Sequence, residues 1–160
     1  MIEGIRMVVS LNGRPARRGG LARSKDNLPA SGNKMKHRIL VVEDDPSFRK
    51  LLADWLETEG FEAALADTLE AAFILIAAEP LPEAVLLDIH LGSMNGLTLV
   101  HWARRQRHLA HMPIVAVTGD ASFKDAKSVQ DAGCDACITK PVDFKALRGI
   151  LATLRVHSAG

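Results

Sequence analysis

The sequence predicts an α/β fold: a doubly wound, five-stranded parallel sheet in strand order 2-1-3-4-5, sandwiched between two layers of helices. Short apolar, β-branched runs, typical of buried parallel strands, alternate along the chain with longer segments of helical periodicity. Repeated alternation of this kind favours right-handed crossovers and a single parallel sheet. With 160 residues, 48% of them hydrophobic, the chain can bury the core of one domain.

The first strand and helix have clear boundaries. An apolar strand over 38–42 precedes Asp45, which can cap a helix that has Pro46 at its first position, where a missing N–H costs nothing. Gly60 ends this helix. Its apolar residues recur at helical spacing and predict one buried face, formed by Phe48, Leu51, Leu52, Trp55 and Leu56.

The next strand and helix are equally regular. Residues 61–66 predict a second strand, after which Asp67 or Thr68 caps a helix that runs to about Glu79. A continuous apolar run predicts the third strand over 84–88.

The second half of the chain repeats the alternation. A Gly-rich turn over 92–96 opens a helix from 97 to about 107, and a fourth strand follows over 114–118. A short helix over 122–132 ends at Gly133. The last elements are a strand over 136–139 and a helix with the apolar residues Phe144, Leu147, Ile150, Leu151 and Leu154.

Charge divides the chain into an acidic body and a basic leader. Residues 1–37 carry eight Lys and Arg against two acidic residues, although the whole chain has a net charge of only +1. We expect 1–36 to be a disordered leader or a misassigned start, 37–157 to form the domain, and 158–160 to be a tail. The body offers no basic face for nucleic acid, no apolar run could span a membrane, and no secretory signal stands out, so we expect a cytoplasmic protein.

Polar residues of a particular kind stand at the carboxyl ends of the predicted strands. In an open parallel sheet this edge is where ligands bind, so these residues should meet there. They are Glu43, Asp44, Asp88, Thr118 and Lys140. Clustered carboxylates repel one another unless a cation neutralises them, and Mg²⁺ prefers such oxygen ligands. Taken singly, the acids could instead cap the first helix, the threonine could cap a helix, and the lysine could lie on the surface.

Together these residues suit phosphoryl transfer. Asp88, at the end of a buried strand and next to a metal, can act as a nucleophile and form an acyl phosphate. Lys140 offers a positive charge and Thr118 a hydroxyl donor to phosphate oxygens. Such chemistry needs little beyond positioning and charge neutralisation.

Four motifs, in this order, resemble response-regulator receiver domains of two-component signalling, with their chemotaxis-receiver-like fold. They are Ile39-Leu40-Val41-Val42-Glu43-Asp44-Asp45-Pro46, Leu86-Leu87-Asp88-Ile89-His90-Leu91, Val117-Thr118-Gly119 and Thr139-Lys140-Pro141. The resemblance implies that Asp88 accepts a phosphoryl group from a sensor histidine kinase or a histidine phosphotransfer protein. It also implies that Asp44, Asp88 and the backbone carbonyl of His90 bind Mg²⁺ directly, and that Glu43 acts through water.

The resemblance extends to the ends of the other strands, but some positions of this sequence differ from the family pattern. It implies that Thr118 and Lys140 contact the phosphoryl oxygens, and that the Lys140-Pro141 peptide is cis. Gly92 stands where relatives usually carry Pro, which predicts a looser loop.

Three further positions bear on the switch itself. Cys137 replaces the usual Tyr or Phe, which puts the aromatic readout of activation in doubt. His90 and Asp120 occupy positions that resemble those setting the dephosphorylation rate. Cys137 also forms a C-x-x-C with Cys134, but its place in a buried strand favours two small core residues over a redox or zinc site.

We therefore predict a stand-alone receiver that is not an enzyme beyond promoting its own phosphorylation and dephosphorylation. Its output would pass to a downstream protein target or by onward phosphotransfer, with homodimerisation on activation as a further possibility. One alternative is an unphosphorylated adaptor of the same fold, which Cys137 keeps open. The other is a small Mg²⁺-dependent phosphatase, which should carry an acid where His90 stands.

Overall fold

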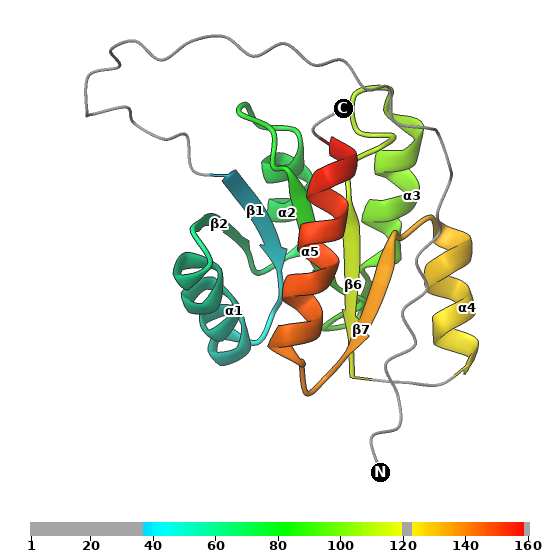
Figure 1. The fold of residues 1–160 in the computed structure, drawn as a ribbon. Coiled ribbons are helices and arrows are strands. Elements are labelled where there is room, and N and C mark those ends of the chain that lie inside the picture. Colours follow the sequence, from blue (N-terminus) through cyan, green and yellow to red (C-terminus); the bar gives the residue numbers. More distant parts are fainter. Residues whose placement is uncertain (1–36, 120–122, 159–160) are drawn as a thin grey trace, which may run out of the picture.

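A five-stranded parallel sheet lies between two helical layers in the computed structural model, which describes residues 37–119 and 123–158 (Figure 1). The strands are β1 (His37–Val42), β2 (Phe61–Ala66), β3 (Ala84–Asp88), β6 (Ile114–Thr118) and β7 (Ala136–Thr139). Their order is β2-β1-β3-β6-β7, and every neighbouring pair is parallel. The predicted fold class and strand order are confirmed. The predicted leader over 1–36, the end of the tail and Asp120 lie outside the described residues.

Helices cover both faces of the sheet. They are α1 (Pro46–Thr58), α2 (Leu69–Ile76), α3 (Leu97–Arg105), α4 (Phe123–Ala132) and α5 (Phe144–Ser158). Helices α1 and α5 cover one face and α2, α3 and α4 the other (Figure 1). A cluster of buried apolar side chains lies between each helical layer and the sheet. No helix in the described ranges is long and apolar enough to cross a bilayer.

The central strands are buried on both faces. Along β1, Ile39 and Val41 belong to the cluster under α1 and α5, whereas Leu40 and Val42 belong to the opposite cluster. All four side chains are at most 1% exposed. An unbroken apolar run is what such a strand requires, because successive side chains point to opposite faces and both faces are covered.

Helix α1 begins as predicted but buries a narrower face. The Asp45 carboxylate accepts hydrogen bonds from the backbone N–H groups of Ser47 and Phe48, which are otherwise free at a helix start. Leu52 is buried, but Leu51 is 49% exposed, so its predicted place on the buried face is wrong. Successive helical residues are about 100° apart, and Leu51 falls at the edge of the apolar stripe.

Two helices are shorter than predicted, and a small hairpin was not predicted. Helix α2 ends at Ile76 and α3 at Arg105, a few residues before the expected ends. Between Asp88 and α3 the chain forms the antiparallel strands β4 (His90–Leu91) and β5 (Met94–Asn95), of which only β5 lies within the expected Gly-rich turn over 92–96. A two-residue connection joins them, with Gly92 at φ +60°, the left-handed conformation that tight hairpins need.

Candidate functional site

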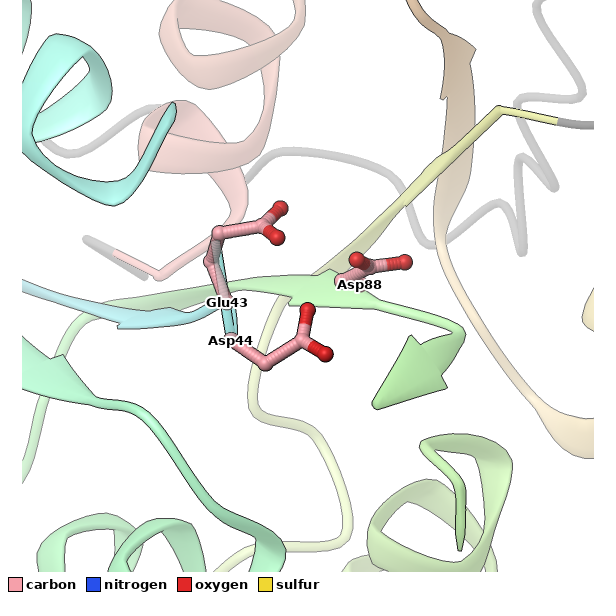
Figure 2. A group of neighbouring side chains, drawn as sticks. All are labelled: Glu43, Asp44 and Asp88. Atoms are coloured by element: carbon pink, nitrogen blue, oxygen red, sulfur yellow. The ribbon is translucent and has the colours of Figure 1, made fainter. Parts of the chain in front are cut away.

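Three carboxylates gather at the carboxyl ends of β1 and β3 (Figure 2). Glu43 and Asp44 follow β1 directly, and Asp88 is the last residue of β3, which pairs with β1. One carboxylate oxygen of each lies within 4.8 Å of the other two. Glu43 is 1% exposed and Asp88 5% exposed, whereas Asp44 is open to solvent. The parallel sheet therefore brings these acids together as the sequence predicts.

Lys140 lies between the two buried acids. Its Nζ is 2.9 Å from Glu43 Oε2 and 3.2 Å from Asp88 Oδ2. The Phe48 ring flanks the ammonium, with its centroid 4.5 Å from Nζ, a distance at which the ring's negative face attracts a cation. The Lys140-Pro141 peptide is cis, as the resemblance implies. The alternative of an unengaged surface lysine is thus wrong.

Burial and mutual contacts shift the pKa values of Glu43 and Lys140. Loss of solvent raises the pKa of Glu43 to about 7, although its hydrogen bond with Lys140 acts in the opposite direction. Burial alone would lower the pKa of Lys140, but the hydrogen bond with Glu43 and the charge of Asp88 hold it above its ordinary value. One ammonium thus faces two buried carboxylates and a third exposed one, which leaves an excess of negative charge.

Backbone donors fix the orientation of each carboxylate. The N–H of His90 donates to Asp88 Oδ1 at 3.0 Å, that of Gly92 to Asp44 Oδ2 at 2.9 Å, and that of Asp45 to Glu43 Oε1 at 3.1 Å. Carboxylate oxygens have further lone pairs, so these bonds leave acceptor capacity for a cation. Hard oxygen ligands with net negative charge fit Mg²⁺.

Thr118 and Cys137 lie on the adjacent strands. Thr118 ends β6, is 2% exposed, and stands one residue beyond Val117, the partner of Asp88 in the β3–β6 register. Its backbone carbonyl accepts the N–H of Lys140 at 2.8 Å, which joins the ends of β6 and β7. Cys137 is half-buried and packs against the cluster under α2, α3 and α4.

The buried Cys134 has a pKa raised to about 12, chiefly by burial. Since the thiolate is the reactive form, this environment suits an inert core residue and supports the reading of the C-x-x-C as structural.

Sequence reasoning missed two residues that shape the site. A Cβ on Gly96 would lie 2.3 Å from the backbone oxygen of Asp88, so only glycine fits there. Arg49 Nη1 donates to the carbonyls of Glu43 at 2.9 Å and Asp44 at 3.4 Å, which holds the acidic loop against α1. Gly96 could have been singled out as the last residue of the Gly-rich turn; nothing in the sequence marks Arg49.

The response regulator receiver domain family matches residues 39–152. This range includes the whole five-stranded sheet except the first two residues of β1. The chain belongs to this family. It is 34% identical to the polar-differentiation response regulator DivK of Brucella ovis over 109 residues, which are 68% of this chain and 87% of that protein.

Solved structures agree in fold. A CheY-like response regulator receiver domain from Methanospirillum hungatei is 32% identical, with a TM-score of 0.69 over 78% of this chain and 99% of that one. The non-phosphorylated HemR receiver domain from Leptospira biflexa is 26% identical, with a TM-score of 0.66 over 74% and 94%. The chain is thus a two-component receiver, a signalling module rather than a classical enzyme.

Proposed function

We propose that this receiver accepts a phosphoryl group on Asp88 in a Mg²⁺-dependent reaction and signals through the phosphorylated state. The observation that carries the proposal is the position of Lys140, whose Nζ lies 3.2 Å from Asp88 Oδ2 beside a group of acids with excess negative charge. A cation that bridges two acids in this way can also meet the oxygens of a phosphoryl group as it arrives. Buried groups in which charges of one sign outnumber the other reduce the stability of the fold, and they are typical of functional sites.

The reaction needs no group beyond those at the site and the donor. A carboxylate oxygen of Asp88 attacks phosphorus and forms the P–O bond of an acyl phosphate, while the P–N bond of the donor's phosphohistidine breaks. The electron pair of that bond leaves with the imidazole, which takes up a proton from solvent. The His90 N–H holds one Asp88 oxygen at 3.0 Å, which fixes the rotation of the nucleophile.

Glu43, Asp44 and Asp88 would hold Mg²⁺, with the backbone carbonyl of His90 as a further ligand. When bound, Mg²⁺ supplies positive charge that offsets the carboxylates and the phosphoryl oxygens. Lys140 and the Thr118 hydroxyl serve the remaining phosphoryl oxygens. The resemblance implies that His90 and Asp120 influence the dephosphorylation rate, and Cys137 stands at the position where relatives use an aromatic ring.

The donor in this proposal is a sensor histidine kinase or a histidine phosphotransfer protein in the cytoplasm. The next partner in this proposal is a downstream protein rather than nucleic acid, because the acidic body of the chain offers no basic face for nucleic acid. Altered partner binding, onward phosphotransfer or homodimerisation would then carry the signal.

The test is intact-mass spectrometry after incubation with acetyl phosphate and Mg²⁺. We expect one phosphoryl adduct in the wild type, none with EDTA and none in Asp88→Ala. The matched control is Asp54→Ala, which removes an exposed acid of α1 that pairs with Lys50 on the same helix and should leave the adduct intact. A folded wild-type protein that takes up no phosphoryl group would refute the proposal and favour the unphosphorylated adaptor.

A further inference from the structure

The β4–β5 hairpin contacts the acid group through two backbone donors, one of which reaches the exposed Asp44. The N–H of Gly92 lies 2.9 Å from Asp44 Oδ2, and the two residues are 48 positions apart in sequence. The hairpin is otherwise tied to Asp88, because His90 N–H donates to Asp88 Oδ1. Two of the three carboxylates therefore take their orientation from this one short element.

Asp44 depends on such a donor more than its neighbours do. Glu43 and Asp88 are almost fully buried and share Lys140, so packing and charge restrict their rotamers. Asp44 is exposed, and an exposed aspartate samples several rotamers unless a partner selects one. The Gly92 N–H selects the rotamer that places an Asp44 oxygen within 4.8 Å of the ligand atoms of Glu43 and Asp88.

We propose that Gly92 is a positioning residue of the cation site: its N–H presets the Asp44 carboxylate, so that Asp44 enters Mg²⁺ binding already oriented. This inference rests on the proposed function, because it assumes that the three acids hold Mg²⁺. One Asp44 oxygen can accept the N–H while the other binds the cation, so the hydrogen bond and the metal are compatible. Preorganisation of this kind raises affinity by removing an ordering cost from the binding step.

Residue 92 must supply a backbone N–H and must also adopt a left-handed conformation, and substitutions can test these two requirements separately. Its φ of +60° suits glycine, and asparagine tolerates it better than other residues do. Alanine keeps the N–H but resists this conformation. Proline, which the resemblance to receiver domains leads one to expect here, lacks the N–H and has φ fixed near −65°.

The experiment is calorimetric titration of the full chain with Mg²⁺, in the wild type, Gly92→Asn, Gly92→Ala and Gly92→Pro. We expect wild-type affinity in Gly92→Asn, which keeps both the donor and the conformation. Gly92→Pro should bind about three- to tenfold more weakly, as expected for the loss of one hydrogen bond of ordinary strength at a solvent-exposed site. Gly92→Ala should lie closer to the wild type. Equal affinity in Gly92→Pro and the wild type, or an equal loss in Gly92→Ala and Gly92→Pro, would overturn the proposal.

A second measurement needs no metal. In Mg²⁺-free protein, the amide proton resonance of Gly92 should lie downfield and move upfield in Asp44→Ala; an unmoved resonance would show that the hydrogen bond is absent in solution and overturn the inference. The two measurements also separate the two proposals. If the resonance moves but the wild type does not bind Mg²⁺, the cation site of the proposed function fails while the contact stands. If the wild type binds Mg²⁺ and all three variants match it, the positioning role fails and the proposed function stands.

Discussion

The two ends of the sheet each carry a network of charged side chains, but the networks are balanced differently. At the amino ends of β6 and β7, the partly buried Arg104 of α3 pairs with Asp135 at 3.0 Å, one cation with one anion. Asp135 also accepts the N–H of Ile114 at 2.8 Å. The remaining guanidinium donors reach backbone carbonyls, those of Gly133, Leu109, Ala110 and Met112. We call this network the Arg104 clamp.

At the carboxyl ends, Lys140 shares its single charge between Glu43 and Asp88 while Asp44 stands beside them. The Arg104 clamp satisfies its own charges and joins α3 to the loops that precede β6 and β7, so its role is structural. The Lys140 network keeps uncompensated negative charge, which the fold tolerates at the edge where ligands bind. The difference suggests that charge balance separates a structural ion pair from a binding site better than burial alone does.

The largest expected effect comes from breaking the Arg104 clamp. Arg104→Ala leaves Asp135 without its cation and strips partners from several backbone carbonyls, which should lower the free energy of unfolding by about 2–4 kcal/mol. Urea denaturation measures this. The matched control is Lys127→Ala, which breaks an exposed i,i+4 pair with Asp131 and should cost at most about 0.5 kcal/mol. Similar losses in the two variants would show that the clamp is no more than a surface pair.

A smaller loss of stability should follow from crowding the backbone at the carboxyl ends of the strands, near Asp88. In Gly96→Ala the new methyl group would meet the Asp88 backbone oxygen, so the loop must shift, at a cost of about 1–3 kcal/mol. The shift also moves Asp88, so the yield of phosphoryl adduct should fall. Gly149→Ala is the control, because nothing lies within 4 Å of its added Cβ on α5. That variant should gain about 0.5–1 kcal/mol of helix stability and keep the full adduct. An unchanged adduct in Gly96→Ala would show that Asp88 does not depend on this close packing.

Much of this arrangement could be predicted from sequence because it follows from strand ends. The strands over 61–66, 84–88 and 114–118 have the predicted bounds, and the parallel topology then brings Glu43, Asp88 and Lys140 to one edge. The β4–β5 hairpin was missed because two-residue strands carry no periodicity.

Other features depend on distant backbone and could not be read from local patterns. The Arg104 clamp joins residues 31 positions apart, and the need for glycine at position 96 arises from the backbone of Asp88. The exposure of Leu51 depends on which part of the apolar stripe of α1 meets the sheet.

The comparison of the two networks is tested most directly by neutralising one acid in each and measuring the free energy of unfolding in EDTA. At a pH above the Glu43 pKa of about 7, Asp88→Asn removes repulsion between two buried carboxylates and leaves Lys140 paired with ionised Glu43, so it should stabilise the protein by about 1 kcal/mol. Asp135→Asn removes the only carboxylate that faces Arg104 in the described structure and should destabilise it by about 1–2 kcal/mol. Opposite signs are the predicted result. Destabilisation of similar size in both variants would contradict the claim that the carboxyl-end network carries unbalanced charge suited to a ligand.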